Sequence, residues 1–187
     1  MRAILLALAF ACGAVLRIGA TSYPSITFDE LVKDADVIFV GEVIDVRPFP
    51  VNTRDGPIVK TRILFRVSDP IYGTAAALEV FEFLGGEWGD VRLTVADMPS
   101  FSVGDRRVVF ARRERSINPI VGFTQGLLKV TRDSAGVDRV VTLDGFPVAG
   151  PDTIGAARQG AAREALPMRL VDLRNQIVRT VAAARKQ

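Results

Sequence analysis

The sequence contains no histidine, and its single cysteine is Cys12. The absence of histidine excludes Ser-His-Asp and Cys-His catalysis and zinc sites with histidine ligands. A chain without Cys12 also has no thiol nucleophile, disulfide or iron–sulfur cluster. Neither a Walker loop nor the Gly-x-Ser-x-Gly, Ser-x-x-Lys or Gly-x-Gly-x-x-Gly motif is present. We therefore expect a protein that is not an enzyme and holds no metal and no cofactor.

The first 20 residues have the pattern of a secretory signal peptide. A short positive start precedes an apolar run over residues 3–16, and small residues follow at the cleavage site. The run is shorter than the roughly 20 apolar residues of a membrane-spanning helix. We expect cleavage after Ala20, with Ala14 as the alternative, and export to the periplasm or the exterior. Lipidation of Cys12 is a further alternative that fits less well, because the residues after it stay apolar.

Charge is distributed unevenly along the remaining chain. Residues 21–152 carry a net charge of −4, and residues 153–187 carry +5. Nucleic-acid binding requires a basic patch on the folded domain, so an acidic body with a basic tail does not predict it. Of the 24 basic residues, 20 are arginine, a bias typical of a GC-rich bacterial genome.

Alternating hydrophobic residues predict a mostly β fold between residues 21 and 150. Thr27 and Glu30 form a capping-box pattern that predicts a short helix ending near Asp34. Gly41 offers a place for a bulge in the first strand, in which Ile38, Val40, Ile44 and Val46 are expected to point to one face. The expected strands are 37–47, which ends at Pro48 and Pro50, then 58–68, 78–84, 91–95, 106–112, 126–132 and 137–143.

Residues 151–187 differ in character from the preceding domain. An Ala/Arg-rich stretch, 153–166, predicts either a helical linker or disorder. Pro167 suits the start of a helix. The residues after Pro167 include an apolar stripe at helical spacing, which predicts a C-terminal helix packed on the β domain. The stripe consists of Leu170, Leu173, Ile177, Val181 and Ala184.

Two irregular stretches are the candidate contact surface. Gly85-Gly86-Glu87-Trp88-Gly89-Asp90 contains three glycines and the sole tryptophan, and Met98 and Phe101 lie in the next loop. One interpretation is that these large side chains fill the end of a barrel. The other is a site for a partner, because tryptophan is enriched at binding hot spots. We name Glu87, Trp88, Met98 and Phe101 as the candidate partner-binding residues.

Two further patterns have both a structural and a functional interpretation. An arginine cluster brackets residues 108–111, either as the charged ends of a buried strand or as an anion site; it comprises Arg106, Arg107, Arg112, Arg113 and Arg115. Asp133-Ser134-Ala135-Gly136 favours a hairpin turn over a calcium loop, because the other acidic ligands and the terminal Glu are missing.

Several segments resemble netrin-like OB-fold domains, the group that includes the tissue inhibitors of metalloproteinases. The resemblance rests on residues 31–43, the strand 61–67 and the turn Tyr72-Gly73. Gly85-Gly86, residues 98–105 and residues 121–126 are also similar to segments of uncharacterised exported bacterial proteins. The resemblance implies an antiparallel OB-like barrel of five to seven strands with a loop-bearing binding face. It does not imply inhibition, which in that group uses an N-terminal cysteine.

The favoured hypothesis is an exported, non-enzymatic binding module that contacts a protein or another envelope macromolecule through loops at the barrel end. One alternative is a structural envelope protein whose basic C-terminal helix, residues 167–187, contacts anionic lipid at the membrane periphery. A protease inhibitor and a hydrolase that uses two unmarked carboxylates are the remaining alternatives.

Overall fold

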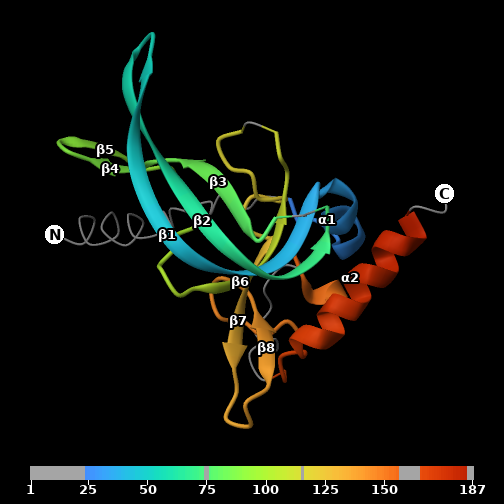
Figure 1. The fold of residues 1–187 in the computed structure, drawn as a ribbon. Coiled ribbons are helices and arrows are strands. Elements are labelled where there is room, and N and C mark those ends of the chain that lie inside the picture. Colours follow the sequence, from blue (N-terminus) through green and yellow to red (C-terminus); the bar gives the residue numbers. More distant parts are fainter. Residues whose placement is uncertain (1–23, 74–75, 115, 156–164, 185–187) are drawn as a thin grey trace, which may run out of the picture.

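The computed structural model describes residues 24–73, 76–114, 116–155 and 165–184. The expected signal peptide, residues 1–20, lies outside these ranges, as does most of the Ala/Arg-rich stretch. The chain is mostly β with two α-helices (Figure 1). The elements are α1 (Phe28–Asp34), β1 (Val37–Thr53), β2 (Gly56–Tyr72), β3 (Leu78–Leu84), β4 (Gly86–Trp88), β5 (Val91–Leu93), β6 (Arg106–Ala111), β7 (Leu127–Arg132), β8 (Asp138–Val141), the 3-10 turn Pro151–Thr153 and α2 (Leu170–Ala184).

Six strands form one antiparallel sheet in the order β3-β2-β1-β6-β7-β8, and β4 and β5 form a separate two-stranded ribbon. The expected mostly β, antiparallel class with an N-terminal and a C-terminal helix is confirmed. The sheet is not closed into a barrel, because β3 and β8 do not pair. Instead, the segment before α2 lies along β8: the Val140 amide donates to the Met168 carbonyl at 3.1 Å, and the Met168 amide donates to the Val148 carbonyl at 2.7 Å.

The prediction that Pro48 and Pro50 end the first strand is wrong. β1 continues to Thr53 and pairs with β2 along its length, with Pro48 opposite Thr61 and Pro50 opposite Val59. Beyond Glu42, β1 has no strand partner on its other edge among the described residues. Two prolines spaced by two residues direct their nitrogens to the same edge, so the missing N–H groups cost no ladder bond there.

Residues on the two faces of β1 enter two separate cores. Ile38 and Val40 lie in the helix-side core, which α1 and α2 cover, whereas Phe39 and Val43 lie in the aromatic core on the opposite face. The register shifts after Val40, which confirms the bulge expected at Gly41. The expected single face is wrong: a further shift, between Val43 and Asp45, leaves Val46 packed against the aromatic core.

Both helices pack on the helix-side core. The capping box of α1 is present, with the Glu30 amide donating to Thr27 Oγ1 at 3.2 Å. α2 confirms the expected packing, since Leu173 and Ile177 on its stripe are fully buried. It begins three residues after Pro167 because the intervening residues pair with β8. Within the described ranges, none of the helices has the length and apolar character needed to cross a membrane.

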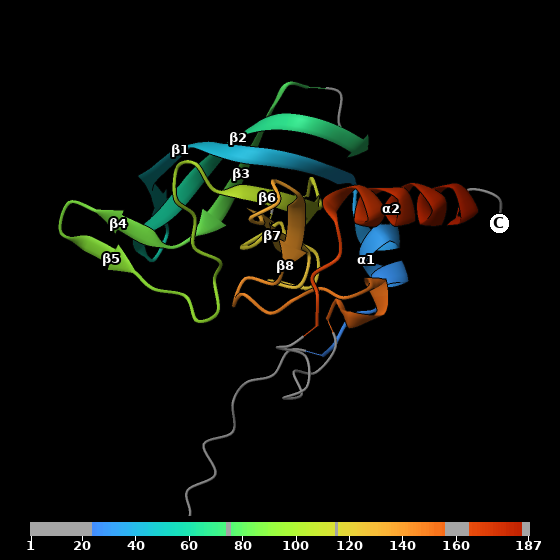
Figure 2. The same ribbon diagram turned by 90° about the horizontal axis from the view of Figure 1, so that it is seen from below.

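The β4–β5 ribbon and α2 lie at opposite ends of the molecule. Two views related by a 90° turn show the ribbon projecting from the body on the side away from the helices (Figures 1 and 2). The ribbon packs against the distal part of the β1–β2 hairpin. The candidate contact residues are therefore far from the C-terminal helix.

Candidate binding pocket beside the β4–β5 ribbon

Two glycines fix the root of the ribbon on β2. The Gly85 amide donates to the Val59 carbonyl at 2.8 Å, and Thr61 Oγ1 donates to the Gly85 carbonyl at 2.7 Å. Gly86 has a φ of 134°, and a Cβ atom there would lie 2.5 Å from Thr61 Oγ1. A side chain at this position would meet both steric conflict and backbone strain. Glycine is therefore required where the ribbon leaves the sheet.

The loop between β5 and β6 brings Phe101 onto the aromatic core. The Phe101 ring lies 4.8 Å from the Phe83 ring at a tilt of 49°, and 5.9 Å from the Phe65 ring in an edge-to-face arrangement. Such pairs add about 0.5–1.5 kcal/mol to the stability that burial alone provides. The loop is thus attached to the core by its own aromatic side chain.

An ion pair holds the end of the same loop. Asp105 accepts hydrogen bonds from the Ser102 amide at 2.8 Å and from the Arg107 guanidinium at 2.6 Å. The Arg107 side chain is only 6% exposed, and its Nε has no hydrogen-bond partner among the described residues. Burying a charge is costly unless it is paired, so Asp105 is the group that makes this buried arginine tolerable.

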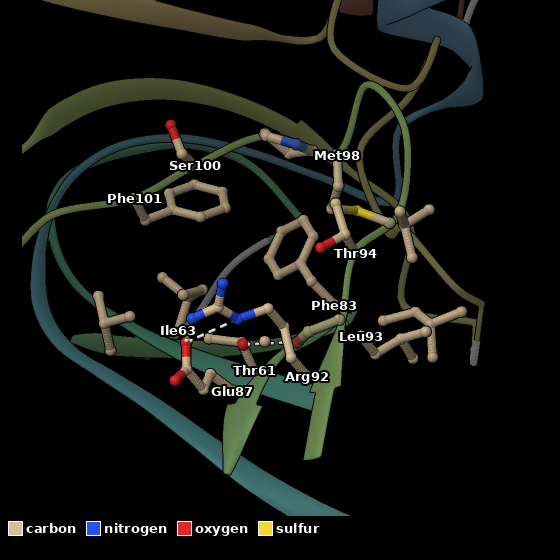
Figure 3. Close-up of a pocket in the computed structure, with 16 residues that line it drawn as sticks. Thr61, Ile63, Phe83, Glu87, Arg92, Leu93, Thr94, Met98, Ser100 and Phe101 are labelled. Carbon is tan, nitrogen blue, oxygen red and sulfur yellow. Dashed lines mark hydrogen bonds and ion pairs between the residues drawn. The ribbon is translucent and has the colours of Figure 1, made fainter. Parts of the chain in front are cut away.

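A pocket of about 410 Å³ lies between the ribbon, β3 and this loop (Figure 3). Its apolar lining comes from the sheet, the ribbon and the loop, and includes Val46, Ile63, Phe83, Leu93, Met98 and Phe101. The polar lining includes Thr94 and Ser100, which are exposed, and the ion pair in which the Arg92 guanidinium donates to Glu87 Oε2 at 2.6 and 3.0 Å. The volume is within the range of roughly 300–1,000 Å³ that is common for ligand sites.

The structure brings together three of the four candidate residues. Glu87, Met98 and Phe101 line the pocket. Trp88 does not; it lies at the end of β4, paired across the ribbon with Val91, and is 49% exposed. The interpretation of a filled barrel end fits Phe101 in part, because Phe101 packs on the aromatic core, but it does not fit Trp88. A half-exposed tryptophan on a projecting ribbon has little to do with core packing.

Leu93 and Thr94 were not predicted to belong to the site. The sequence predicted a strand over 91–95, whereas β5 ends at Leu93 and Thr94 lies in the loop that follows, where it lines the pocket. Nothing in the sequence around Gly85–Asp90 indicates that the strand after it is as short as β5. Ile63 and Phe83 were predicted to be strand residues. They line the pocket because of the position of the loop between β5 and β6, which the sequence does not indicate.

The described arginines of the cluster at β6 are paired with carboxylates, which favours the structural interpretation over an anion site. Arg106 binds both oxygens of Asp138 at 2.8 and 3.0 Å, and Arg112 binds Asp34 at 2.6 Å. Arg113 binds the buried Glu79 at 3.0 Å. The fifth member, Arg115, lies outside the described residues.

Arg106 on β6 and Asp138 on β8 form an ion pair with two hydrogen bonds. Hydrogen bonds from Arg106 and then from Arg132 hold the pKa of Asp138 down at about 2, although partial burial works in the opposite direction. The same pair raises the pKa of Arg106. The carboxylate therefore stays ionised until the solution is strongly acidic.

Asp133 forms a hairpin turn, as predicted. Its carboxylate accepts hydrogen bonds from the Ala135 and Val137 amides at 2.9 and 2.8 Å and pairs with Arg139. These contacts lower the pKa of Asp133, the Val137 amide contributing most. No group of three or more candidate metal-binding side chains occurs in the part of the chain that the structure describes.

Comparison with known proteins assigns no family to the chain. Neither a family model nor a curated protein matches the sequence.

Proposed function

We propose that this protein is an exported binding module that contacts a protein or another envelope macromolecule through the β4–β5 ribbon and the adjacent pocket. One observation carries the proposal: an open, apolar pocket lies beside a projecting ribbon with a half-exposed tryptophan. Contiguous exposed apolar surface marks interaction sites in folded proteins, and tryptophan is enriched at the hot spots of such sites. The rigid sheet beneath supports loops that are positioned for contact.

Two features of the pocket favour binding over catalysis. Among the residues that the structure describes, Glu87 is the only carboxylate in the lining, so these residues offer no pair of acids for glycoside hydrolysis there. Arg92 occupies one oxygen of Glu87 with two hydrogen bonds. That oxygen is therefore already bound within the protein.

The lipid-docking alternative receives less support from the packing of α2. Its apolar stripe is used inside the molecule, where Leu173 and Ile177 are fully buried. Arg174 binds Asp69 at 2.8 Å, which removes one of the basic side chains from contact with anionic lipid. We therefore assign α2 to the core and the binding role to the ribbon end.

Substitution of the exposed tryptophan tests the proposal. Trp88→Ala and Val178→Ala each remove one partly exposed apolar side chain, from the ribbon and from α2 respectively. Pull-down from an envelope extract with the wild type and both variants should lose a partner only for Trp88→Ala. Unchanged partners for a folded Trp88→Ala protein would contradict the ribbon as the contact surface.

A further inference from the structure

We infer that the pocket receives an uncharged apolar side chain carried by a peptide segment of a protein partner. The inference rests on the proposed function and specifies the chemistry of its ligand. It follows from the floor of the pocket, the charge of its rim and its exposed hydrogen-bonding groups.

The floor of the pocket suits an aromatic or branched apolar group. The Phe83 and Phe101 rings lie tilted at 4.8 Å from each other, and Met98 and Leu93 complete the surrounding surface (Figure 3). Aromatic rings favour stacked and edge-to-face contacts, and methionine adapts its shape to an incoming ring. The volume of about 410 Å³ leaves room for one large side chain with part of its main chain.

The charges at the rim neutralise each other. Arg92 donates through both Nε and Nη2 to the same oxygen of Glu87, at 3.0 and 2.6 Å. No other charged side chain lines the pocket among the described residues. A charged group entering the pocket would lose water without gaining a counter-charge, which is unfavourable. An uncharged group pays no such penalty.

The exposed polar groups at the rim favour a peptide over a lipid chain. Thr94 and Ser100 are exposed at the entrance, whereas Thr61 already donates to the Gly85 carbonyl at 2.7 Å. Hydroxyl groups at a pocket entrance can exchange hydrogen bonds with the amides of a peptide main chain. An acyl chain has no such groups, so it would leave these hydroxyl groups unused.

Backbone-amide NMR of the purified exported chain tests the inference with defined probes. N-acetyl-tryptophanamide and N-acetyl-leucinamide represent apolar side chains, N-acetyl-lysinamide and N-acetyl-glutamate amide represent charged ones, and dodecyl maltoside below its micelle concentration represents an acyl chain. We expect the apolar amides to shift the signals of Leu93, Thr94 and Phe101 with a Kd at least tenfold lower than that of the charged amides. Equal or tighter binding of a charged probe or of the detergent, or no saturable shift with any probe, would overturn the inference.

A pocket-filling variant supplies the matched control. Thr94→Trp places a large ring at the rim, and Thr131→Trp makes the same change at an exposed threonine on β7, outside the pocket lining. We expect N-acetyl-tryptophanamide to bind at least tenfold more weakly to Thr94→Trp and unchanged to Thr131→Trp. Equal binding to both variants would place the probe elsewhere and overturn the inference. The Trp88→Ala pull-down fails or succeeds independently of these probes, so failure of the ligand class is distinguishable from failure of the proposed function.

Discussion

The two ends of this molecule use large apolar residues in opposite ways. At the helical end, α1 and α2 cover the helix-side core. The apolar stripe of α2 packs on this core, where Leu173 is fully buried. At the ribbon end, the aromatic core is covered by a loop and a two-stranded ribbon, which leave a pocket and a half-exposed Trp88. Helices that cover a core bury its apolar side chains, whereas loops that cover a core leave part of its apolar surface accessible for contact.

Shortening a buried side chain of α2 should have the largest effect on stability. Leu173→Ala removes a fully buried side chain and should lower the free energy of unfolding by about 2–5 kcal/mol. Val178→Ala, on the same helix but 42% exposed, should change it by less than about 0.5 kcal/mol. Urea denaturation measures both. Similar small effects for the two variants would show that α2 is not part of the core.

The root of the ribbon should be the next most sensitive position. Gly86→Ala places a Cβ atom 2.5 Å from Thr61 Oγ1 at a φ of 134°, and we expect a loss of about 2–3 kcal/mol. Gly89→Ala is the matched control: its φ is 56°, no atom lies within 4 Å of its Cβ position, and it should cost about 1 kcal/mol. If Gly89→Ala proves the more damaging change, the ribbon root is not fixed as described.

A smaller, pH-dependent effect is expected at Asp138. Its pKa of about 2 lies below the ordinary value near 3.9, so its contribution to stability is present above about pH 4 and is lost as the pH falls towards 2. Because water screens the pair, we expect Asp138→Asn to cost about 1 kcal/mol at pH 7 and much less at pH 2. Denaturation of both proteins across this range tests the prediction, and a difference that grows on acidification would contradict it.

The smallest effect on stability should come from the ion pair at the pocket rim. Arg92 and Glu87 are exposed by 71% and 59%, so Arg92→Ala should lower the free energy of unfolding by less than about 1 kcal/mol. The same change leaves Glu87 unpaired and should let N-acetyl-lysinamide bind more tightly. A large loss of stability would mean that the ion pair holds the ribbon in place.

The sequence predicted features that depend on local chemistry. Thr27 and Glu30 form the capping box of α1, Asp133 forms the hairpin turn, and the stripe through Leu173 and Ile177 packs inward. In each case the interacting groups are close in sequence or share one face of one element, so spacing alone is informative. Features that depend on which strands pair at the edges of the sheet were not predictable from spacing.

The prolines of β1 and the open sheet illustrate that limit. Pro48 and Pro50 are tolerated because no described strand pairs with the neighbouring edge there, which depends on where β6 ends. Likewise, the segment at Met168 occupies the edge of β8, where closure of a barrel would require another strand. In the pocket, Glu87, Met98 and Phe101 were recognised from their unusual loops, but Thr94 was not, since nothing in its neighbours indicates that the strand ends before it.

Site-specific photocrosslinking in cells that produce the protein tests most directly whether the ribbon end, and not the helical end, is the contact surface. A p-benzoylphenylalanine residue in place of Val91, which is 38% exposed and pairs with Trp88 across the ribbon, samples the ribbon end without filling the pocket, and the same residue in place of Val178 samples the exposed face of α2. We predict a discrete crosslinked product for position 91 and none for position 178. A product formed only from position 178 would contradict the assignment of the ribbon end as the contact surface.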